Sequence, residues 1–224
     1  MREIVLDTET TGFKPAEGHR IVEIGCLELH NHVPTGNSFH KYVNPERDMP
    51  TEASQVHGLS EGFLSDKPVF AEVVGEFLEF IGDSRLVIHN AAFDMAFINA
   101  ELELVGFPAL PMSRSLDTVR MARDKFPGAQ ASLDALCRRF NIDNSARTKH
   151  GALLDAELLA EVYLELMGGR QRGFGLTDAP EREAAGPIAI ERVARQPRPH
   201  EASEEELAAH RKFLERLTEP LWEK

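Results

Sequence analysis

The sequence predicts an α/β fold with a mixed central sheet flanked by helices, plus a flexible tail at the C-terminus. The first part of the chain carries short apolar runs separated by turn residues, which is typical of antiparallel hairpins. The middle part alternates apolar runs with segments of helical spacing, which is typical of α/β units. After Gly169 bulky apolar residues become scarce, so the 224 residues hold one sizeable core and an appendage.

The first predicted strand lies in the stretch Ile4–Gly12, where β-favouring residues precede Asp7, Thr8 and Glu9. Side chains alternate along a strand, so Asp7 and Glu9 point to one face and Thr8 points to the other. Two neighbouring buried carboxylates repel each other unless a cation neutralises them, and their oxygens suit Mg²⁺ or Mn²⁺. The alternative is an exposed edge strand that ends in solvated acids.

Two more strands are expected, over residues 20–30 and around Phe39–Val43, and Asn44-Pro45 ends the second of them. Both would pair antiparallel beside the first strand. The next segment, residues 51–62, is polar, and Ser60 is a candidate helix cap within it.

A helix, a strand and a second helix follow. Residues 70–81 place apolar side chains at helical spacing, and Gly82 ends this helix. Residues 86–90 read as a short buried strand parallel to the first. The second helix covers 91–105, with Asn90 as its N-cap.

Three further helices complete the predicted core. The first covers residues 117–126, and the second covers 132–140 with Ser132 as its cap. The polar stretch 141–149 then leads into a long helix that ends near Met167.

The acid Asp94 falls in the first turns of a helix that follows a core strand, where open sheets place their sites. The alternative for Asp94 is an acid that complements the helix dipole. His150 and Asp155 are five residues apart, which rotates them about 140° on a helix. They reach one site only if His150 lies before or at the first turn, and otherwise His150 is a surface residue.

Four acids and a histidine at the edges of core elements match the needs of two-metal phosphodiester hydrolysis. In that chemistry one ion activates a water and both ions stabilise the attacking and leaving oxygens. A neutral histidine can take the proton of the water, because its ordinary pKa is close to physiological pH.

Composition limits the classes of function. The net charge of −12 argues against broad electrostatic binding of nucleic acid, so a polynucleotide would be held locally through metals and a few polar contacts. Cys26 and Cys137 lie in apolar patterns and suggest reduced thiols in a cytoplasmic protein. No apolar run approaches the length of a membrane span, and no signal peptide is expected.

The tail divides into a linker and a helix. Residues 170–202 are rich in proline and arginine and indicate a flexible linker. Ser203–Glu206 is a capping box that begins a helix with a narrow apolar stripe at Leu207, Leu214 and Leu217. This tail is too small to fold alone, so it is either disordered or a docking element for another protein.

Several motifs together resemble the DEDDh exonucleases, which have an RNase H-like fold, and resemble most closely the proofreading epsilon subunits of bacterial DNA polymerase III. The resemblance is dense over residues 2–169 and continues more weakly to Trp222. The motifs that carry it are Ile4–Gly12, Val56–Gly58, Val87–Asp94, Ser132–Cys137 and His150–Ala156.

The resemblance implies roles for particular residues. Asp7, Glu9 and Asp155 would bind one metal, Asp7 would also hold the second, and Asp94 would support the second through water. His150 would be the general base. The 3′-terminal nucleotide would contact the metal ligands and a further set of residues, namely Thr8, Thr10, Glu52 and His57.

The resemblance also implies a division of labour along the chain and a set of partners. Residues 1–169 would be the exonuclease domain, 170–202 a linker, and 203–224 a segment that docks to the polymerase alpha subunit. A small theta-like subunit is a further expected partner. Family members carry a glutamine-led clamp motif after the core, where Gln171–Leu176 stands here. Phe174 and Leu176 depart from that pattern, which leaves a sliding-clamp contact open.

The leading hypothesis is a 3′–5′ exonuclease that proofreads single-stranded or frayed DNA ends and releases nucleoside 5′-monophosphates. A second hypothesis is a stand-alone relative that trims RNA or small oligonucleotides, which gives no reason for a linker and a docking helix. A third is a catalytically silent assembly module, in which the buried acids would only be a liability.

Overall fold

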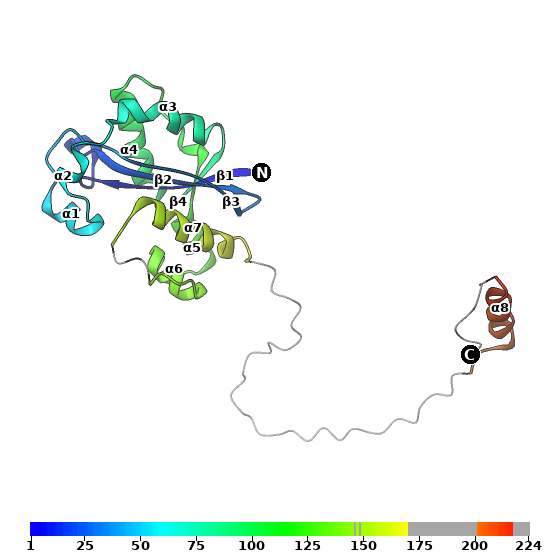
Figure 1. Ribbon diagram of the computed structural model, residues 1–224. Coiled ribbons are helices and arrows are strands. Elements are labelled where there is room, and N and C mark those ends of the chain that lie inside the picture. The colour runs from blue at the N-terminus through cyan, green and yellow to red at the C-terminus, as the bar shows by residue number, and fades with distance from the viewer. Residues whose placement is uncertain (146, 148, 170–200, 217–224) are drawn as a thin grey trace, which may run out of the picture. The chain divides into compact units, whose positions relative to one another are not determined.

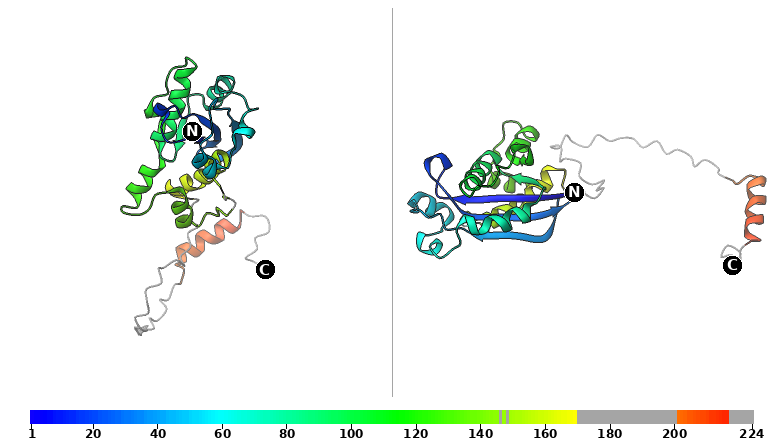
Figure 2. Two further views of the ribbon diagram at one scale, coloured as in Figure 1. Left: turned by 90° about the vertical axis from the view of Figure 1, so that its left-hand side faces the viewer. Right: turned by 90° about the horizontal axis from the view of Figure 1, so that it is seen from above.

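The computed structural model describes residues 1–145, 147, 149–169 and 201–216. The chain divides into two units, Met1–Phe174 and Gly175–Lys224, and each is described by itself. In the first unit a sheet is sandwiched between two layers of helices (Figure 1, Figure 2). Within the described residues, no helix is long and apolar enough to cross a membrane.

The sheet has five strands in the order β3-β2-β1-β4-β5. The first three strands along the chain pair antiparallel, whereas β4 and β5 run parallel to β1. This confirms the predicted mixed sheet with a hairpin-rich start. The strands are β1 (Arg2–Thr10), β2 (Ile21–His30), β3 (Val33–Tyr42), β4 (Arg85–Ile88) and β5 (Ser115–Asp117).

Helices cover both faces of the sheet (Figure 1). Helices α3 and α4 pack against one face of the sheet, and helices α5, α6 and α7 pack against the other. The helices of this unit are α1 (Thr51–His57), α2 (Glu61–Leu64), α3 (Phe70–Ile81), α4 (Ala91–Leu104), α5 (Thr118–Lys125), α6 (Leu133–Phe140) and α7 (Ala152–Leu166). Short 3₁₀ turns cover Pro15–Glu17 and Met112–Arg114.

The alternation of β1 decides which side chains enter which core. Ile4 and Leu6 are buried in the cluster under α3 and α4, whereas Val5 belongs to the cluster under α7. Because the strand has a period of two, the same parity carries Asp7 and Glu9 to the α7 face and Thr8 to the α4 face. The two carboxylates therefore stand on one side of the sheet, as the sequence predicts.

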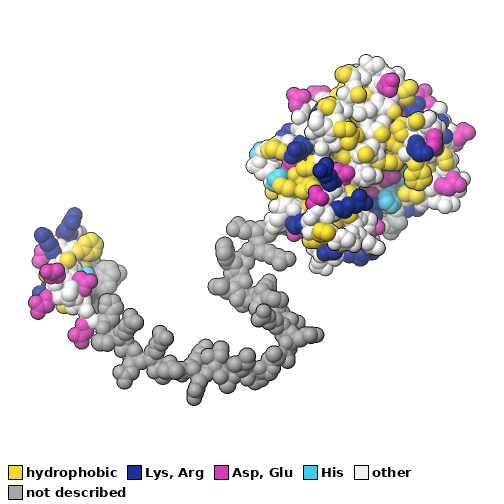
Figure 3. All heavy atoms as spheres, turned by 180° about the vertical axis from the view of Figure 1, so that it is seen from behind, with side chains coloured by type: hydrophobic (Ala, Val, Ile, Leu, Met, Phe, Trp, Pro, Cys, Tyr) yellow, Lys and Arg dark blue, Asp and Glu magenta, His cyan; other side chains and the backbone are white. Residues whose placement is uncertain are grey.

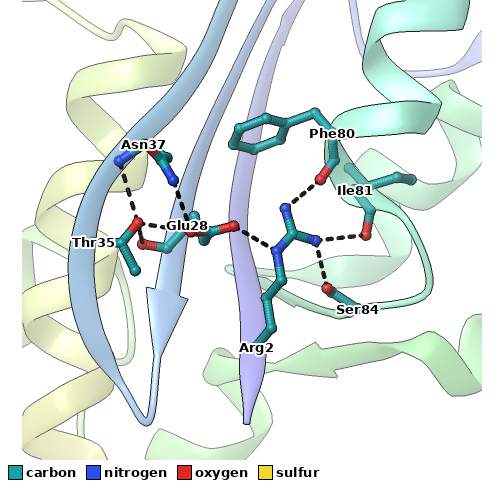
Figure 4. A network of polar contacts seen from close by, with 7 residues as sticks. All are labelled: Arg2, Glu28, Thr35, Asn37, Phe80, Ile81 and Ser84. Atoms are coloured by element: carbon teal, nitrogen blue, oxygen red, sulfur yellow. Dashed lines mark hydrogen bonds and ion pairs between the residues drawn. The ribbon is translucent and has the colours of Figure 1, made fainter.

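A polar network fixes the other end of β1 (Figure 4). Arg2 donates from Nε to Glu28 on β2 at 2.5 Å and from Nη2 to the carbonyl of Phe80 at 2.6 Å. Its Nη1 donates to Ser84 at 2.7 Å. The guanidinium thereby satisfies a carbonyl at the C-terminal end of α3 and joins that helix to the sheet.

Gly25 allows α7 to lie close against β2. Gly25 is the register partner of Asp7, and a Cβ atom placed on it would come within 2.3 Å of the backbone of Ala152 and Leu153. These residues begin α7, the helix that carries Asp155 in its first turn. The missing side chain at Gly25 therefore sets the distance between the acids of β1 and the acid of α7.

The structure extends or corrects several predicted elements. The third strand begins at Val33, earlier than Phe39. The polar segment predicted over 51–62 contains the short helix α1 and the start of the short helix α2. Ser60 does cap the second of them, accepting from the N–H of Phe63. Strand β5 was not predicted, and Asp117 is both its last residue and the N-cap of α5.

The predicted N-cap position of Asn90 is confirmed, but its side chain does not cap the helix. Asn90 stands at the N-cap position of α4, but its side chain makes no cap hydrogen bond and its backbone is left-handed, with φ of 68°. Asparagine is one of the few residues that adopt this conformation readily, and here it turns the chain sharply from β4 into α4. Ser132, by contrast, caps α6 as predicted.

The described part of the second unit contains the helix α8 (Glu204–Leu214). Ser203 and Glu206 form the predicted capping box, and the side chains of Leu207 and Phe213 are exposed. Residues 170–200 of the predicted linker 170–202 lie outside the described residues, as do the motif Gln171–Leu176 and the terminal Leu217 and Trp222.

The close approach of β2 and α7 gives a testable prediction. Gly25→Ala should destabilise the protein by about 1–3 kcal/mol, because the new methyl group overpacks the start of α7. Gly75→Ala is the matched control, since Gly75 is exposed in α3 with nothing within 4 Å of a Cβ, and it should gain up to about 1 kcal/mol. Urea unfolding of both variants measures the difference. Equal midpoints for Gly25→Ala and wild type would contradict the packing.

Candidate active site

A cavity of about 760 Å³ opens where β1 and β4 end. All the site residues predicted from the sequence line it, although they come from four separate parts of the chain. These residues are Asp7, Thr8, Glu9, Thr10, Glu52, His57, Asp94, His150 and Asp155.

Asp94 is fixed by the strand that carries the other acids. The backbone N–H and the hydroxyl of Thr8 both donate to Oδ1 of Asp94, at 3.0 Å and 2.7 Å. Thr8 can do this because strand alternation turns it toward α4, away from Asp7 and Glu9. Asp94 is only 3% exposed, so it is a buried acid with fixed orientation rather than a solvated first-turn residue.

His150 lies just before α7, which is the placement that the sequence required for it to share a site with Asp155. Its backbone N–H donates to the carbonyl of Val56 at 3.2 Å, so α1 holds the loop that carries the imidazole. Nδ1 of His150 lies 3.2 Å from Oδ2 of Asp155. Ligand atoms of Glu9, His150 and Asp155 lie within 4.8 Å of one another, which is close enough to hold a metal ion.

Arg147 is the main site residue that the sequence analysis missed. Its guanidinium donates to both oxygens of Asp155, at 2.5 Å and 2.6 Å, and to Asp134 at 2.7 Å. A fourth contact joins Nη2 of Arg147 to Nδ1 of His150 at 2.8 Å. Nothing in the polar stretch 141–149 signals this, since the contacts depend on how the loop folds back over α7.

The far side of the cavity is formed by α1 and the end of β1. Glu52 is exposed on α1, whereas His57 at the end of α1 is buried. Nδ1 of His57 accepts from the N–H of Leu59 at 3.0 Å, which leaves the proton of the neutral ring on Nε2. Burial lowers the pKa of His57, so it presents a neutral donor near the cavity.

Unneutralised negative charge dominates the electrostatics of the cavity. Burial and the charges of Asp94, Glu9 and Asp155 raise the pKa of Asp7 well above its ordinary value. Burial, followed by the charges of Asp155 and Glu23, raises the pKa of Glu9 to about 8. Burial also raises the pKa of Asp94. These acids gain most from a bound cation, because it would restore their charged forms.

Asp155 differs from the other acids. Burial alone would raise its pKa, but hydrogen bonds from His150 and Arg147 outweigh burial and hold the pKa below its ordinary value. The donor set as a whole consists of carboxylates and one imidazole, which suits divalent ions of the Mg²⁺ and Mn²⁺ kind. The residues present therefore fit a metal centre.

A family model described as exonuclease matches residues 4–163 of the chain. DNA polymerase III subunit epsilon of Rickettsia conorii is 51% identical over 224 residues, which covers 97% of this chain and 96% of the relative. The chain belongs to the DNA polymerase III epsilon family. DNA polymerase III subunit epsilon of Escherichia coli K12 is 46% identical over 225 residues, which covers 96% of this chain and 92% of the relative.

Solved structures agree with the fold. A structure of exonuclease X in complex with 5′ overhanging duplex DNA superposes with a TM-score of 0.57 at 25% identity, covering 73% of this chain and 90% of that one. The nuclease domain of 3′hExo, a DEDDh family member bound to rAMP, gives a TM-score of 0.65 at 18% identity, covering 74% and 91%. The chain is thus an exonuclease of the DNA polymerase III epsilon family, a hydrolase that acts on DNA, and its fold is that of the solved exonucleases.

The raised pKa of Glu9 predicts how the stability of the metal-free protein depends on pH. Between the ordinary value of 4.5 and about 8, the folded epsilon-family chain holds a proton that the unfolded chain has released. Stability should therefore be lost as pH rises through about 8. Urea unfolding in EDTA at about pH 5 and about pH 9 measures this change, because the loss accumulates between the two pKa values.

Glu9→Gln is the control for this prediction, because it removes the titrating group and should therefore reduce the dependence of stability on pH. Saturating Mn²⁺ should reduce it as well, since the metal binds the deprotonated acid. A metal-free wild type that becomes more stable over the same interval would contradict the assignment.

Proposed function

We propose that this epsilon-family exonuclease removes mispaired 3′-terminal nucleotides from newly replicated DNA by two-metal hydrolysis and releases nucleoside 5′-monophosphates. The observation that carries the proposal is the convergence of Asp7, Glu9, Asp94, His150 and Asp155 on one cavity. Burial, and after it the charges of neighbouring acids, raise the pKa values of Asp7 and Glu9, so the cavity is built for cations rather than for neutral ligands.

The ions would be Mg²⁺ or Mn²⁺, and each acid would have a distinct part in holding them. Asp7, Glu9 and Asp155 would bind one ion, and Asp7 would share the second. Oδ1 of Asp94 accepts two hydrogen bonds from Thr8. The remaining lone pairs of this carboxylate would accept hydrogen bonds from a water bound to the second ion. When bound, the ions supply activation of the attacking water and stabilisation of charge in the transition state.

His150 is proposed as the general base. Its imidazole is partly exposed at the mouth of the cavity, where water can reach it, while its backbone is held to α1 through Val56. Its ring lies beside Asp155 and within metal-ligand reach of Glu9. A base in this place can take the proton of a water that approaches the scissile phosphorus.

The substrate is proposed to be a single-stranded or frayed 3′ end of DNA. Thr8, Thr10, Glu52 and His57 line the cavity together with Asp7, Glu9 and Asp155, and they would contact the terminal nucleotide. On the face shown in Figure 3, basic and acidic side chains of the described residues are interspersed. With a net charge of −12, this favours local capture of a strand end rather than broad attraction to DNA.

The second unit is proposed to join the exonuclease to the polymerase alpha subunit in the cytoplasm. Helix α8 exposes Leu207 and Phe213 and buries no side chain of its own. An amphipathic helix of this kind gains stability by placing its apolar stripe in a groove of a partner. Residues 170–202 would then be a linker between the exonuclease domain, 1–169, and a docking segment, 203–224. A theta-like subunit would be an additional partner, and Gln171–Leu176 is a weak match to a clamp motif.

Replacement of the proposed base tests the mechanism. His150→Ala should lower turnover on a 3′-labelled single strand by about 10²–10⁴-fold and remove the acid limb of the rate profile. His30→Ala, at an exposed position at the end of β2, is the control and should leave turnover unchanged. Calorimetry should show Mn²⁺ affinity nearly unchanged in His150→Ala. A large loss of affinity would instead make His150 a metal ligand.

Truncation tests the division of labour. A chain that ends at Gly169 should keep full activity on single strands, because every proposed catalytic residue precedes that point. It should no longer co-elute with the alpha subunit on gel filtration. In the full chain, Leu214→Asp and Trp222→Ala should each weaken the complex through lost apolar burial. Undiminished binding by the truncated chain would move the docking role to the surface of the exonuclease domain.

A further inference from the structure

Arg147 contacts Asp155, Asp134 and His150, and neither the proposed mechanism nor the family resemblance assigns it a role. Its side chain is 8% exposed, and the Asp155 side chain that it contacts is 3% exposed. The guanidinium engages Asp155 as a fork, with Nε on Oδ1 and Nη2 on Oδ2. Such bidentate pairs are among the strongest polar contacts that proteins make.

The guanidinium faces the groups that are expected to bind metal. Nη2, one of the two nitrogens on Asp155, also lies 2.8 Å from Nδ1 of His150. Glu9, His150 and Asp155 are the three residues whose ligand atoms lie within 4.8 Å of one another. A divalent ion among them would stand within a few ångströms of the positive charge of Arg147. Two cations so close in a partly buried cavity repel each other strongly.

The Arg147 guanidinium already contacts a second carboxylate, at the rim of the cavity. Nη1 of Arg147 donates to Asp134 at 2.7 Å, and the Asp134 side chain is 46% exposed, at the rim of the cavity. The residue sits in the loop between α6 and α7, where its backbone N–H donates to the carbonyl of Asn144 at 3.0 Å. The side chain can therefore swing toward Asp134 without breaking a helix or a strand.

We propose that Arg147 is the resident counter-cation of the metal-free site, and that a divalent ion displaces its guanidinium from Asp155 toward Asp134. This rests on the metal centre proposed above. The same movement withdraws Nη2 from Nδ1 of His150. A guanidinium can only donate hydrogen bonds, so its departure frees the lone pair of that nitrogen. Arg147 is thus a positioning residue that pairs with Asp155 and contacts Nδ1 of His150 while no metal is bound.

Isothermal titration of the full chain with Mn²⁺ tests the exchange without any assay of activity. Arg147→Gln should bind Mn²⁺ more tightly than wild type by at least about fivefold, because the metal no longer competes with the guanidinium. The metal-free variant should melt at a lower temperature than wild type, since Asp155 has lost its partner. With saturating Mn²⁺ the difference in melting temperature should shrink.

Two further variants distinguish the bidentate contact of Arg147 with Asp155 from the effect of its positive charge alone. Arg147→Lys keeps the positive charge but loses the fork, and its Mn²⁺ affinity should fall between those of wild type and Arg147→Gln. Arg138→Gln removes an exposed charge from the last turn of α6 and should bind Mn²⁺ as wild type does. If Arg147→Gln is too unstable without metal, Arg147→Lys still reports the competition.

Three results would overturn the proposal. Unchanged or weaker Mn²⁺ affinity in Arg147→Gln, with the same loss of melting temperature in both metal states, would make Arg147 a structural brace. Wild-type affinity in Arg147→Lys would show that charge alone matters. Failure of wild type itself to bind Mn²⁺ would remove the metal centre, and that outcome is recognisable because it is already seen before any substitution.

Discussion

The crowding of carboxylates at the end of β1 is the constraint on which the rest of the site depends. Asp7 and Glu9 stand on one face of a buried strand, and burial together with the charges of Asp94, Glu9 and Asp155 raises the pKa of Asp7. Like charges in a cavity of low dielectric are stable only with a counter-cation or with bound protons. Arg147 supplies a counter-cation to Asp155. Glu9 instead holds a proton, because its pKa is raised to about 8. The need for a cation is therefore built into the fold before any substrate arrives.

The sheet and its covering helices hold these acids together by specific close contacts. Gly25 brings the start of α7 against β2, opposite Asp7. Thr8 ties Asp94 to β1 from the other face of the sheet. Val56 ties the loop of His150 to α1, which also carries Glu52. A site assembled by contacts between elements far apart in sequence gains precision from the rigid core beneath it.

The sequence alone predicted the acids better than their surroundings. Strand alternation was sufficient to place Asp7 and Glu9 together, and helix geometry required His150 to precede α7. Arg147 was missed because it lies in a loop without periodicity, where sequence spacing does not indicate contacts with Asp134 on α6 or Asp155 on α7. Strand β5 has three residues, too few for an alternation pattern. Asn90 suits both an N-cap and a left-handed turn, and only the path from β4 to α4 decides between them.

The central claim is that the acids at the end of β1 hold divalent ions directly. Anomalous diffraction from crystals of the full chain grown with Mn²⁺ and a nucleoside 5′-monophosphate measures this without reference to rates. The account predicts one manganese peak among Asp7, Glu9 and Asp155 and a second peak that shares Asp7. Crystals in which the nucleotide occupies the cavity but no anomalous peak lies beside Asp7 would contradict it.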